Sequence, residues 1–453
     1  MILLLSIVSY TASHSQTVQY TMPEETEEHE GTWIQWPHNY LYGPWYKDDV
    51  TSTFVDMAKA LQVGEKVHII AYDSTEYAYI VSELNSAGVP LTNIDFFIYP
   101  TDDVWIRDNG PMFVYDQYGE LTILDWGFNG WGLDTPYSLC DIIPESISAD
   151  LSIPVVDLNS VVLEGGAIEH DGYGTMLATR SSITHPSRNP GLTEQQIEDK
   201  LTTYMGISKF IWLDGIYGED ITDQHIDGFV KFANDSTIVT MNSEDLAYWY
   251  VSASEIDIIN NASNINEDPY QIVELPLTQN NVITTYGQNL GYKGSYVNYY
   301  IGNDVVLLPT YNDPNDALAI TIIQGVYPNR NVVGVDVRNL YAYGGMIHCI
   351  TQQQPVALNT TGLLEHSVTP STRVQNNPNP FDDFTTISID LENNYSGRLN
   401  IYNNLGQIVK TIAVSNMDQD VILNTKDFEG GVYTYSLIVD GKIVGSNRLV
   451  VNK

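Results

Sequence analysis

The chain has 453 residues, of which 57 are acidic and 19 are basic, so its formal net charge is −38. This charge argues against nucleic acids and anionic membranes as partners, because both would repel the chain, and it favours a cationic substrate. Hydrophobic residues make up 43% of the sequence, too many for a disordered protein, and the length predicts at least two folded domains.

The chain begins with a short apolar run that ends in small residues at Ser13 and Ser15. This pattern resembles a signal peptide cut before Gln16, and the run is too short to span a bilayer. We therefore expect residues 1–15 to be removed, and the mature protein to be exported without a transmembrane segment.

Residues 16–356 alternate between strand-like and helix-like segments. Buried strands are predicted at Val67–Tyr72, Asp95–Tyr99 and Val305–Pro309, which are short apolar runs followed by turn residues. Helices are predicted at Asp49–Leu61 and Thr193–Met205, the second opened by a Thr-x-x-Gln capping box. The pattern predicts one large α/β domain.

A short internal echo links two parts of this domain, since Gly165-Gly-Ala-Ile-Glu recurs as Gly344-Gly-Met-Ile-His. Chance alone can explain so short a match. The alternative is a pseudo-symmetric fold in which equivalent loops of repeated units meet at one central site.

Charged or nucleophilic residues stand beside glycines in four segments, each of which resembles a strand end that runs into a tight loop. Such loops are where a rigid scaffold usually displays a functional site. The segments are residues 102–111, 163–166, 222–228 and 344–350.

Cys349 is a candidate nucleophile, because the two cysteines, Cys140 and Cys349, exclude a disulfide framework. A reactive thiol needs a group that favours its thiolate. On a strand, the adjacent His348 would point to the opposite face, so we expect the activating group elsewhere. A buried structural cysteine is the alternative.

Three further positions carry acid and base candidates, each with a plainer alternative. His225 and Asp227 are two apart, so an extended backbone would place both on one face; a surface pair is the alternative, and a metal site lacks a third ligand. Asp108 follows Arg107 and can simply form a salt bridge with it. Glu164 precedes two glycines and can simply be solvated.

Together these residues suggest one chemistry. Two carboxylates on opposing loops can hold a planar guanidinium through paired N–H donors. Cys349 can then attack its central carbon, while His225 protonates the departing ammonia and later activates water. This chemistry needs no metal or organic cofactor, and the sequence has no dinucleotide or phosphate-binding loop.

The motifs, taken in order, resemble the agmatine deiminase and bacterial peptidylarginine deiminase family. The resemblance implies a five-bladed, pseudo-symmetric β/α propeller. It implies Cys349 as nucleophile, His225 as general acid and base, Asp108 and Asp227 as the guanidinium clamp and Glu164 as a supporting acid. It places Trp105 beside the substrate's aliphatic arm, with a role in core packing as the alternative. The matching segments are Met22–Glu25, Glu30–Trp33, Asp103–Pro111, Asp125–Gly132, Leu163–Gly166, Arg188–Pro190, His225–Asp227, Tyr311–Ala317 and Ile347–Gln353.

The resemblance favours agmatine as substrate, with N-carbamoylputrescine and ammonia as products. The peptidylarginine type carries arginines where this chain has Gly130 and Gly132, so a substrate carboxylate would lose its water without a partner. Met346, where agmatine deiminases usually have Asn, and the expected export keep arginine residues of proteins open as the alternative substrate. A non-catalytic surface or adhesive protein on a deiminase scaffold is the alternative of another class.

The C-terminal part changes character. Residues 357–373 have the polar composition of a linker, and residues 374–453 alternate as short strands of a small β-sandwich, for which a carbohydrate-binding or adhesive module is one interpretation. This part resembles the C-terminal sorting domain of type IX secretion cargo, which implies the type IX machinery as a partner and a secreted or cell-surface location. The resembling segments are Asn377–Phe381, Gly406–Lys410, Gly430–Tyr435 and Leu449–Lys453.

Overall fold

A computed structural model describes residues 20–40, 42–358, 373–390, 396–403, 408–415, 419–428, 430–439 and 442–452. The chain divides into two compact units, with the division after Leu358. The predicted signal peptide, 1–15, lies outside the described residues, as does nearly all of the predicted linker, 357–373, so both stay predictions.

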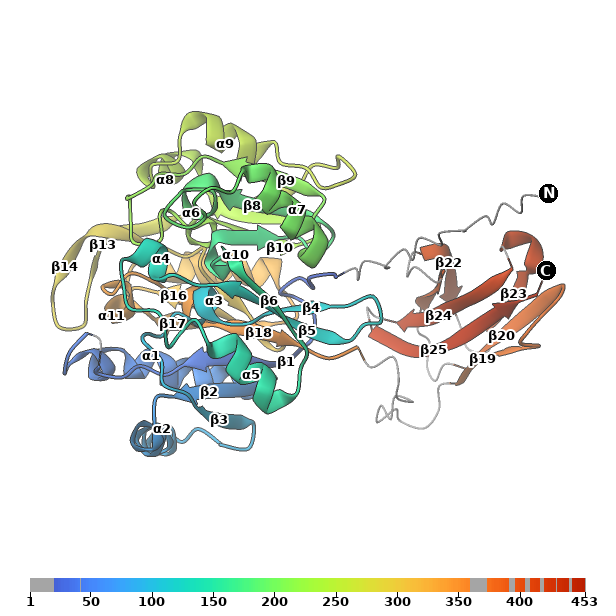
Figure 1. Cartoon of the computed structure of the whole chain (residues 1–453), viewed down its shortest axis with the longest axis horizontal. Helices are drawn as coiled ribbons and strands as arrows, with labels where there is room; N and C mark the ends of the chain where they lie inside the picture. Colours follow the sequence, from blue (N-terminus) through green and yellow to red (C-terminus); the bar gives the residue numbers. More distant parts are fainter. Residues whose placement is uncertain are drawn as a thin grey trace, which may run out of the picture. The chain divides into compact units, whose positions relative to one another are not determined.

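The first unit contains five small sheets and one hairpin (Figure 1). The first sheet has the order β18 (Gln352–Pro355), β1 (His29–Gln35), β2 (Lys66–Ala71) and β3 (Ile94–Ile98). The next three are β4 (Met112–Tyr115), β5 (Leu121–Gly127) and β6 (Val155–Val162); β7 (Ile168–His170), β8 (Thr175–Thr179) and β9 (Lys209–Leu213); and β10 (Val230–Asn234), β11 (Thr237–Met241) and β12 (Gln271–Leu275). The fifth is β15 (Tyr300–Ile301), β16 (Val305–Thr310) and β17 (Asn331–Asp336), and the hairpin is β13 (Leu277–Ile283) with β14 (Asn289–Ser295).

All five sheets repeat one strand arrangement. The first strand pairs antiparallel with the second, and the second pairs parallel with the third. In the first sheet, β18 pairs antiparallel with β1, and β1 pairs parallel with β2. A parallel pair needs a crossover between its strands, which is where the helices lie.

The longer helices connect the parallel strands of each sheet. They are α1 (Tyr46–Leu61), α2 (Ser74–Ser86), α5 (Ile143–Leu151), α7 (Glu194–Met205), α8 (Ser243–Tyr248), α9 (Ala253–Asn260) and α10 (Asp316–Val326). Short turns of helix are α3 (Ile106–Asn109), α4 (Gly130–Leu133), α6 (Arg180–Ile183) and α11 (Arg338–Tyr341). The capping box predicted at Thr193 and Gln196 is present at the start of α7.

The α/β class predicted for this unit is therefore confirmed. Within the described residues the five sheets remain separate, and no closed barrel joins them. Among those residues, no helix is long and apolar enough to cross a membrane.

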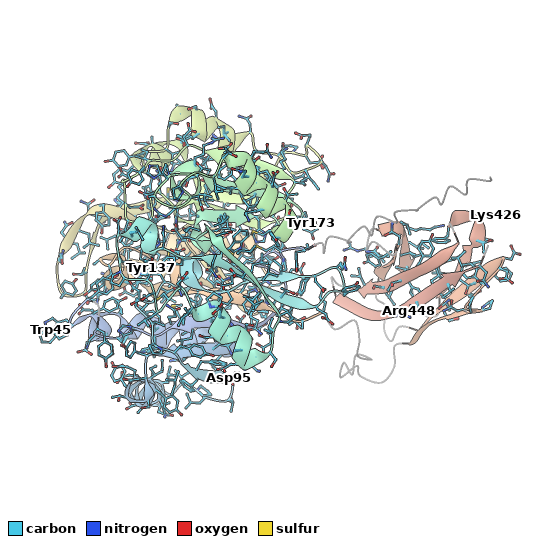
Figure 2. The ribbon with its side chains drawn as sticks, viewed as in Figure 1. Trp45, Asp95, Tyr137, Tyr173, Lys426 and Arg448 are labelled. Atoms are coloured by element: carbon cyan, nitrogen blue, oxygen red, sulfur yellow. The ribbon has the colours of Figure 1, made fainter. Side chains whose placement is uncertain are left out.

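Apolar side chains from the strands and crossover helices fill the interior, including Ile69 of β2, Val239 of β11 and Leu307 of β16, all fully buried. Figure 2 shows the side chains, with Trp45 and Tyr173 on the surface. This close packing makes a rigid scaffold for the loops between sheets.

The second unit is all β. One antiparallel sheet has the order β19 (Arg373–Asn377), β20 (Phe384–Asp390) and β23 (Gln419–Asn424), and the other β22 (Ile408–Ser415), β21 (Ser396–Tyr402), β24 (Gly431–Val439) and β25 (Lys442–Val451). Ile387 and Leu423 of the first sheet share one apolar cluster with Leu399, Tyr435 and Leu449 of the second. A single helical turn, η4 (Thr425–Asp427), follows β23.

Candidate active site

Four short helical turns come together in the first unit: α3, η1 (Gly165–Ala167), η2 (Ile226–Gly228) and η3 (His348–Ile350). Each lies just before the first strand of a sheet, namely β4, β7, β10 and β18. The four segments that the sequence singled out therefore meet, as expected of equivalent loops in repeated units.

The local backbone differs from the prediction in two of these segments. An extended backbone is expected at His225–Asp227 and a strand at His348 and Cys349, but η2 and η3 are turns, closed by Phe229 N–H to the Ile226 carbonyl and Ile350 N–H to the Ile347 carbonyl. Strand pairing begins only at Val230 and Gln352, where a neighbouring strand becomes available. A strand would point successive side chains to opposite faces, whereas these turns direct them toward one site.

Cys349 lies on η3, partly buried, with its Sγ 3.5 Å from Asn298 Oδ1 and 4.0 Å from Asp227 Oδ2. Burial, reinforced by the Asp227 and Asp108 carboxylates, raises the pKa of the thiol well above its usual value. The thiol is therefore neutral at physiological pH in this site.

Asp108 is fixed by two donors. The Gly166 N–H donates to its Oδ1 at 3.0 Å, and Trp131 Nε1 donates to its Oδ2 at 2.9 Å. Burial, with Glu164 and Asp227 acting in the same direction, raises the pKa of this carboxyl, although His225 opposes the shift. The alternative of a salt bridge to Arg107 is not realised: Arg107 donates instead to Gln353 at 2.8 Å and to the His348 carbonyl.

His225 stands between two acids, with Nε2 2.9 Å from Glu164 Oε2 and Nδ1 3.7 Å from Asp108 Oδ1. Burial alone would lower its pKa, but Asp108, Glu164 and Asp227 outweigh burial and raise the pKa to about 9. His225 is therefore protonated at neutral pH and can act as a proton donor.

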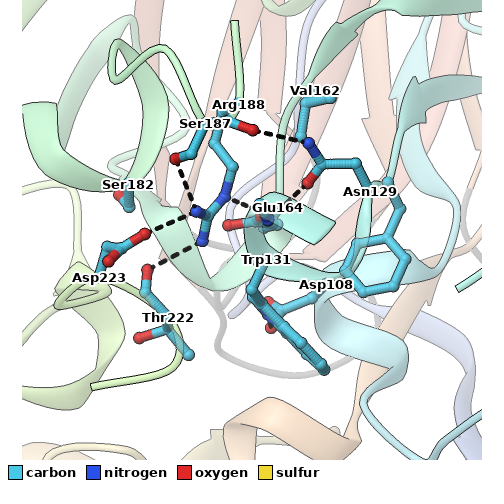
Figure 3. A network of polar contacts seen from close by, with 12 residues as sticks. Asp108, Asn129, Trp131, Val162, Glu164, Ser182, Ser187, Arg188, Thr222 and Asp223 are labelled. Carbon is cyan, nitrogen blue, oxygen red and sulfur yellow. Dashed lines mark hydrogen bonds and ion pairs between the residues drawn. The ribbon is translucent and has the colours of Figure 1, made fainter. Parts of the chain in front are cut away.

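Glu164 is completely buried, which rules out the solvated alternative. Its Oε1 accepts from Arg188 Nε at 2.6 Å, and Arg188 also donates to Asp223 at 2.6 Å and to the Thr222 carbonyl (Figure 3). The sequence contains Arg188 in a matching motif but gives no sign of this contact. The guanidinium of Arg188 pairs with Glu164 Oε1, so Glu164 Oε2 remains available to contact His225.

We expect Arg188→Met to destabilise the protein by about 3 kcal/mol or more in urea unfolding, because buried Asp223 loses its cation and buried Glu164 keeps only His225. Arg180→Gln is the matched control, since the Arg180–Glu194 pair is 37% exposed on both sides and should cost less than about 1 kcal/mol. Equal losses in the two variants would contradict the account of Arg188.

Asp227 faces the site from η2, and its Oδ2 lies 2.8 Å from His348 Nδ1. Burial pushes the pKa of Asp227 upward, but His348, together with His225 and Arg107, outweighs burial and lowers it. The expectation that His348 points away from the site is therefore wrong, because η3 is a turn and not a strand.

Asn298 comes from the segment just before β15, so the fifth sheet also contributes to the site. Its Oδ1 lies 3.0 Å from the His348 N–H and 3.5 Å from Cys349 Sγ, and its Nδ2 donates to the Asp227 carbonyl at 3.3 Å. Sequence reasoning missed it; a polar residue inside the buried run Tyr296–Ile301 was the available signal.

Gly166 occupies the centre of the cluster. A Cβ atom here would lie 2.7 Å from His225 Nδ1, 2.9 Å from Asp108 Oδ1 and 3.0 Å from Asp227 Oδ2. These separations are shorter than side chains tolerate, so only glycine lets the three groups approach one another.

Trp105 is buried at the start of α3, and its ring packs directly on Gly345, close to the turn that carries Cys349. A cavity of about 30 Å³ lies behind the site, lined by residues that include Glu25, Arg107, Gly165, Glu169 and His348. None of the predicted clamp or nucleophilic side chains lines it.

Comparison with known proteins bears directly on this site. The family described as Porphyromonas-type peptidyl-arginine deiminase matches residues 21–355, and a secretion system C-terminal sorting domain matches residues 377–452. The sorting domain, of the type IX kind, indicates a secreted or cell-surface protein.

Individual relatives agree with the family match. A Listeria monocytogenes protein named "Putative agmatine deiminase 1" is 32% identical, over 76% of this chain and 98% of the relative. The structure of an agmatine deiminase of Enterococcus faecalis aligns with a TM-score of 0.66 at 28% identity, covering 74% of this chain and 96% of that chain. A Campylobacter jejuni agmatine deiminase shares the fold, with a TM-score of 0.63 at 24% identity over 76% of this chain and 98% of that one.

We conclude from these matches, with which the α/β fold and the converging turns agree, that the chain belongs to the Porphyromonas-type peptidyl-arginine deiminase family, hydrolases that act on guanidino groups.

Proposed function

We propose that this enzyme hydrolyses agmatine to N-carbamoylputrescine and ammonia, with Cys349 as nucleophile. The observation that carries the proposal is the buried pair of carboxylates, Asp108 and Asp227, which together with burial raise the pKa of the neighbouring Cys349 thiol. A guanidinium would bring a positive charge to these acids and offers a planar array of N–H donors.

The clamp orients the substrate. Asp108, held by Gly166 and Trp131, and Asp227, held by His348, present their carboxylates from different turns. Trp105 is proposed to lie beside the aliphatic arm of the substrate. Once the guanidinium is bound, its charge offsets the two acids and favours the thiolate of Cys349.

The reaction proceeds in two stages. Cys349 Sγ bonds to the central guanidinium carbon while His225 gives a proton to one terminal nitrogen, and the C–N bond breaks to release ammonia. The oxygen of a water then bonds to the thiouronium carbon while the water gives one proton to His225. The C–S bond breaks, its electron pair and the remaining hydroxyl proton pass to Cys349 as the thiol, and the carbonyl of N-carbamoylputrescine forms. Glu164 keeps the His225 ring oriented throughout.

The loop at residues 130–132 supports agmatine over arginine. Gly130 and Gly132 have positive φ angles of 64° and 91°, which disfavour arginine at either position. Between them, Trp131 points inward to Asp108. Trp131 of this loop holds Asp108, and residues 130–132 carry no cation. The carboxylate of an arginine substrate would therefore find no partner in this loop.

Ammonia release from agmatine, free arginine and an arginine peptide, measured in parallel, tests the proposal. We expect agmatine to give the highest kcat/KM, by about a hundredfold or more over free arginine, since an unpaired carboxylate is costly to desolvate. Faster turnover of the peptide would instead assign the enzyme to arginine residues of proteins.

Export is the observation that favours the peptide as second candidate. A protein that carries a sorting domain meets extracellular proteins, whose arginines are cationic guanidines on flexible segments. Met346, which departs from the usual agmatine-type residue, is buried and accepts a hydrogen bond from Tyr311 at 3.0 Å.

The proposal extends to the fold. Five sheets of one topology each place a short segment at the site, as the blades of a pseudo-symmetric propeller around a central axis would. A crystal structure in which the five sheets do not surround Cys349 would contradict this arrangement.

A further inference from the structure

Both ring nitrogens of His348 face carboxylate oxygens. Nδ1 lies 2.8 Å from Asp227 Oδ2, and Nε2 lies 2.8 Å from Glu25 Oε2. A neutral imidazole donates from one nitrogen only, and an ionised carboxylate can only accept. Both hydrogen bonds therefore exist together when His348 is an imidazolium between two anions.

Glu25 is well suited to be the outer anion. Its Oε2 also lies 3.0 Å from Lys231 Nζ and 3.6 Å from Arg107 Nη2, while its Oε1 accepts from the Ile301 N–H at 2.8 Å. Burial would raise the pKa of Glu25, but Lys231, His348 and Arg107 outweigh burial and hold it well below its usual range. Glu25 is therefore ionised at neutral pH.

Charged groups approach His348 from several neighbouring elements. In addition to the two carboxylates that it contacts, cations and a further acid stand nearby. These groups are Asp227 on η2, Glu25 before β1, Arg107 on α3, Lys231 on β10 and Glu169 on β7, and His170, also on β7, lines the same cavity.

We propose that His348 and Glu25 are positioning residues of the deiminase site, which fix Asp227 and balance its charge beside Cys349. The same oxygen, Asp227 Oδ2, lies 2.8 Å from His348 and 4.0 Å from Cys349 Sγ. Without the imidazolium, this carboxylate would turn more freely and would oppose the thiolate more strongly. The inference rests on the proposed function, because it assigns Asp227 to the guanidinium clamp.

His348→Gln tests the charge on the inner side. Glutamine can still donate to Asp227, but it brings no positive charge. We expect the pH profile of Cys349 alkylation by iodoacetamide to move about one unit or more toward alkaline pH. We also expect kcat/KM for the guanidine that the wild type hydrolyses to fall by about tenfold to a hundredfold.

Glu25→Gln tests the outer side without touching Asp227 or Cys349. The site would then lose one buried anion, and His348 would face Lys231 and Arg107 without the carboxylate that offsets them. We expect kcat/KM to fall by about tenfold and the alkaline limb of its pH profile to move to lower pH by about one unit. Loss of packing alone would lower the amount of folded enzyme without moving either limb.

His68→Gln is the matched control, since His68 is buried on β2 with its Nε2 2.8 Å from Glu30 Oε2 and contacts none of the site residues. It should leave both profiles in place. The inference is overturned if His348→Gln and Glu25→Gln retain wild-type profiles, or if His68→Gln moves them equally. If the wild type releases ammonia from none of the guanidines tested, the proposed function is wrong. The pH profiles of Cys349 alkylation would still test whether His348 carries a charge beside Asp227.

Discussion

Replacing Cys349 with alanine is expected to abolish ammonia release, with a loss of at least about a thousandfold in kcat. The reason is that no other group in contact with the site can form the covalent bond to the guanidinium carbon. The fold should persist, because Cys349 is only partly buried and its Sγ makes two long contacts, at 3.5 and 4.0 Å. A coupled ammonia assay and a thermal melt measure the two effects.

Cys140→Ala provides the control for this substitution. Cys140 is buried among Gln35 and Asp103, and burial raises the pKa of its thiol to about 12, so it does not ionise at physiological pH. Its alanine variant should keep wild-type turnover. Undiminished turnover by Cys349→Ala would refute the covalent mechanism.

Gly166→Ala is expected to lower kcat/KM by about a hundredfold or more. The new methyl would lie within 3.0 Å of the His225, Asp108 and Asp227 side chains, so at least one of the three must move. A displacement of about 1 Å among reacting groups is enough for a loss of this size. The main chain itself accepts alanine here, since Gly166 is absent from the positions with positive φ.

The control for this variant is Gly325→Ala in α10, where an added Cβ meets nothing within 4 Å. Alanine should stabilise that helix slightly and leave kcat/KM unchanged. Steady-state kinetics on both variants, with far-UV circular dichroism to check folding, separate crowding of the site from a general effect of replacing glycine. Turnover within a few fold of wild type in Gly166→Ala would contradict the geometry described for the cluster.

The sequence predicted those features that have local causes. Apolar runs located β2, β3 and β16, and a capping pair located the start of α7, because each depends on residues a few positions apart. The grouping of Asp108, Glu164, His225, Asp227 and Cys349 could be predicted from chemistry and resemblance. The roles of these residues stay a proposal that the variants described here test.

The contacts that hold these groups could not be predicted, because they join distant segments through the fold. Three of these contacts come from residues with no local signal of a role: Asn298 just before β15, Trp131 in the loop with Gly130 and Gly132, and Arg188 in a turn. Only the tertiary structure brings them to the site. The orientation of His348 was mispredicted for a related reason, since three residues of helical turn precede the strand and reverse the expected face.

The pairing of β18 with β1 has a consequence for biosynthesis. The strand that follows Cys349 docks beside the first strand of the unit, so the beginning and end of this region meet in one sheet. A nascent chain that stops before residue 349 contains Asp108, Glu164, His225 and Asp227 but not the proposed nucleophile. On the proposed mechanism such a chain cannot hydrolyse the substrate, and the site is complete only when the strand after Cys349 pairs with the first strand of the unit.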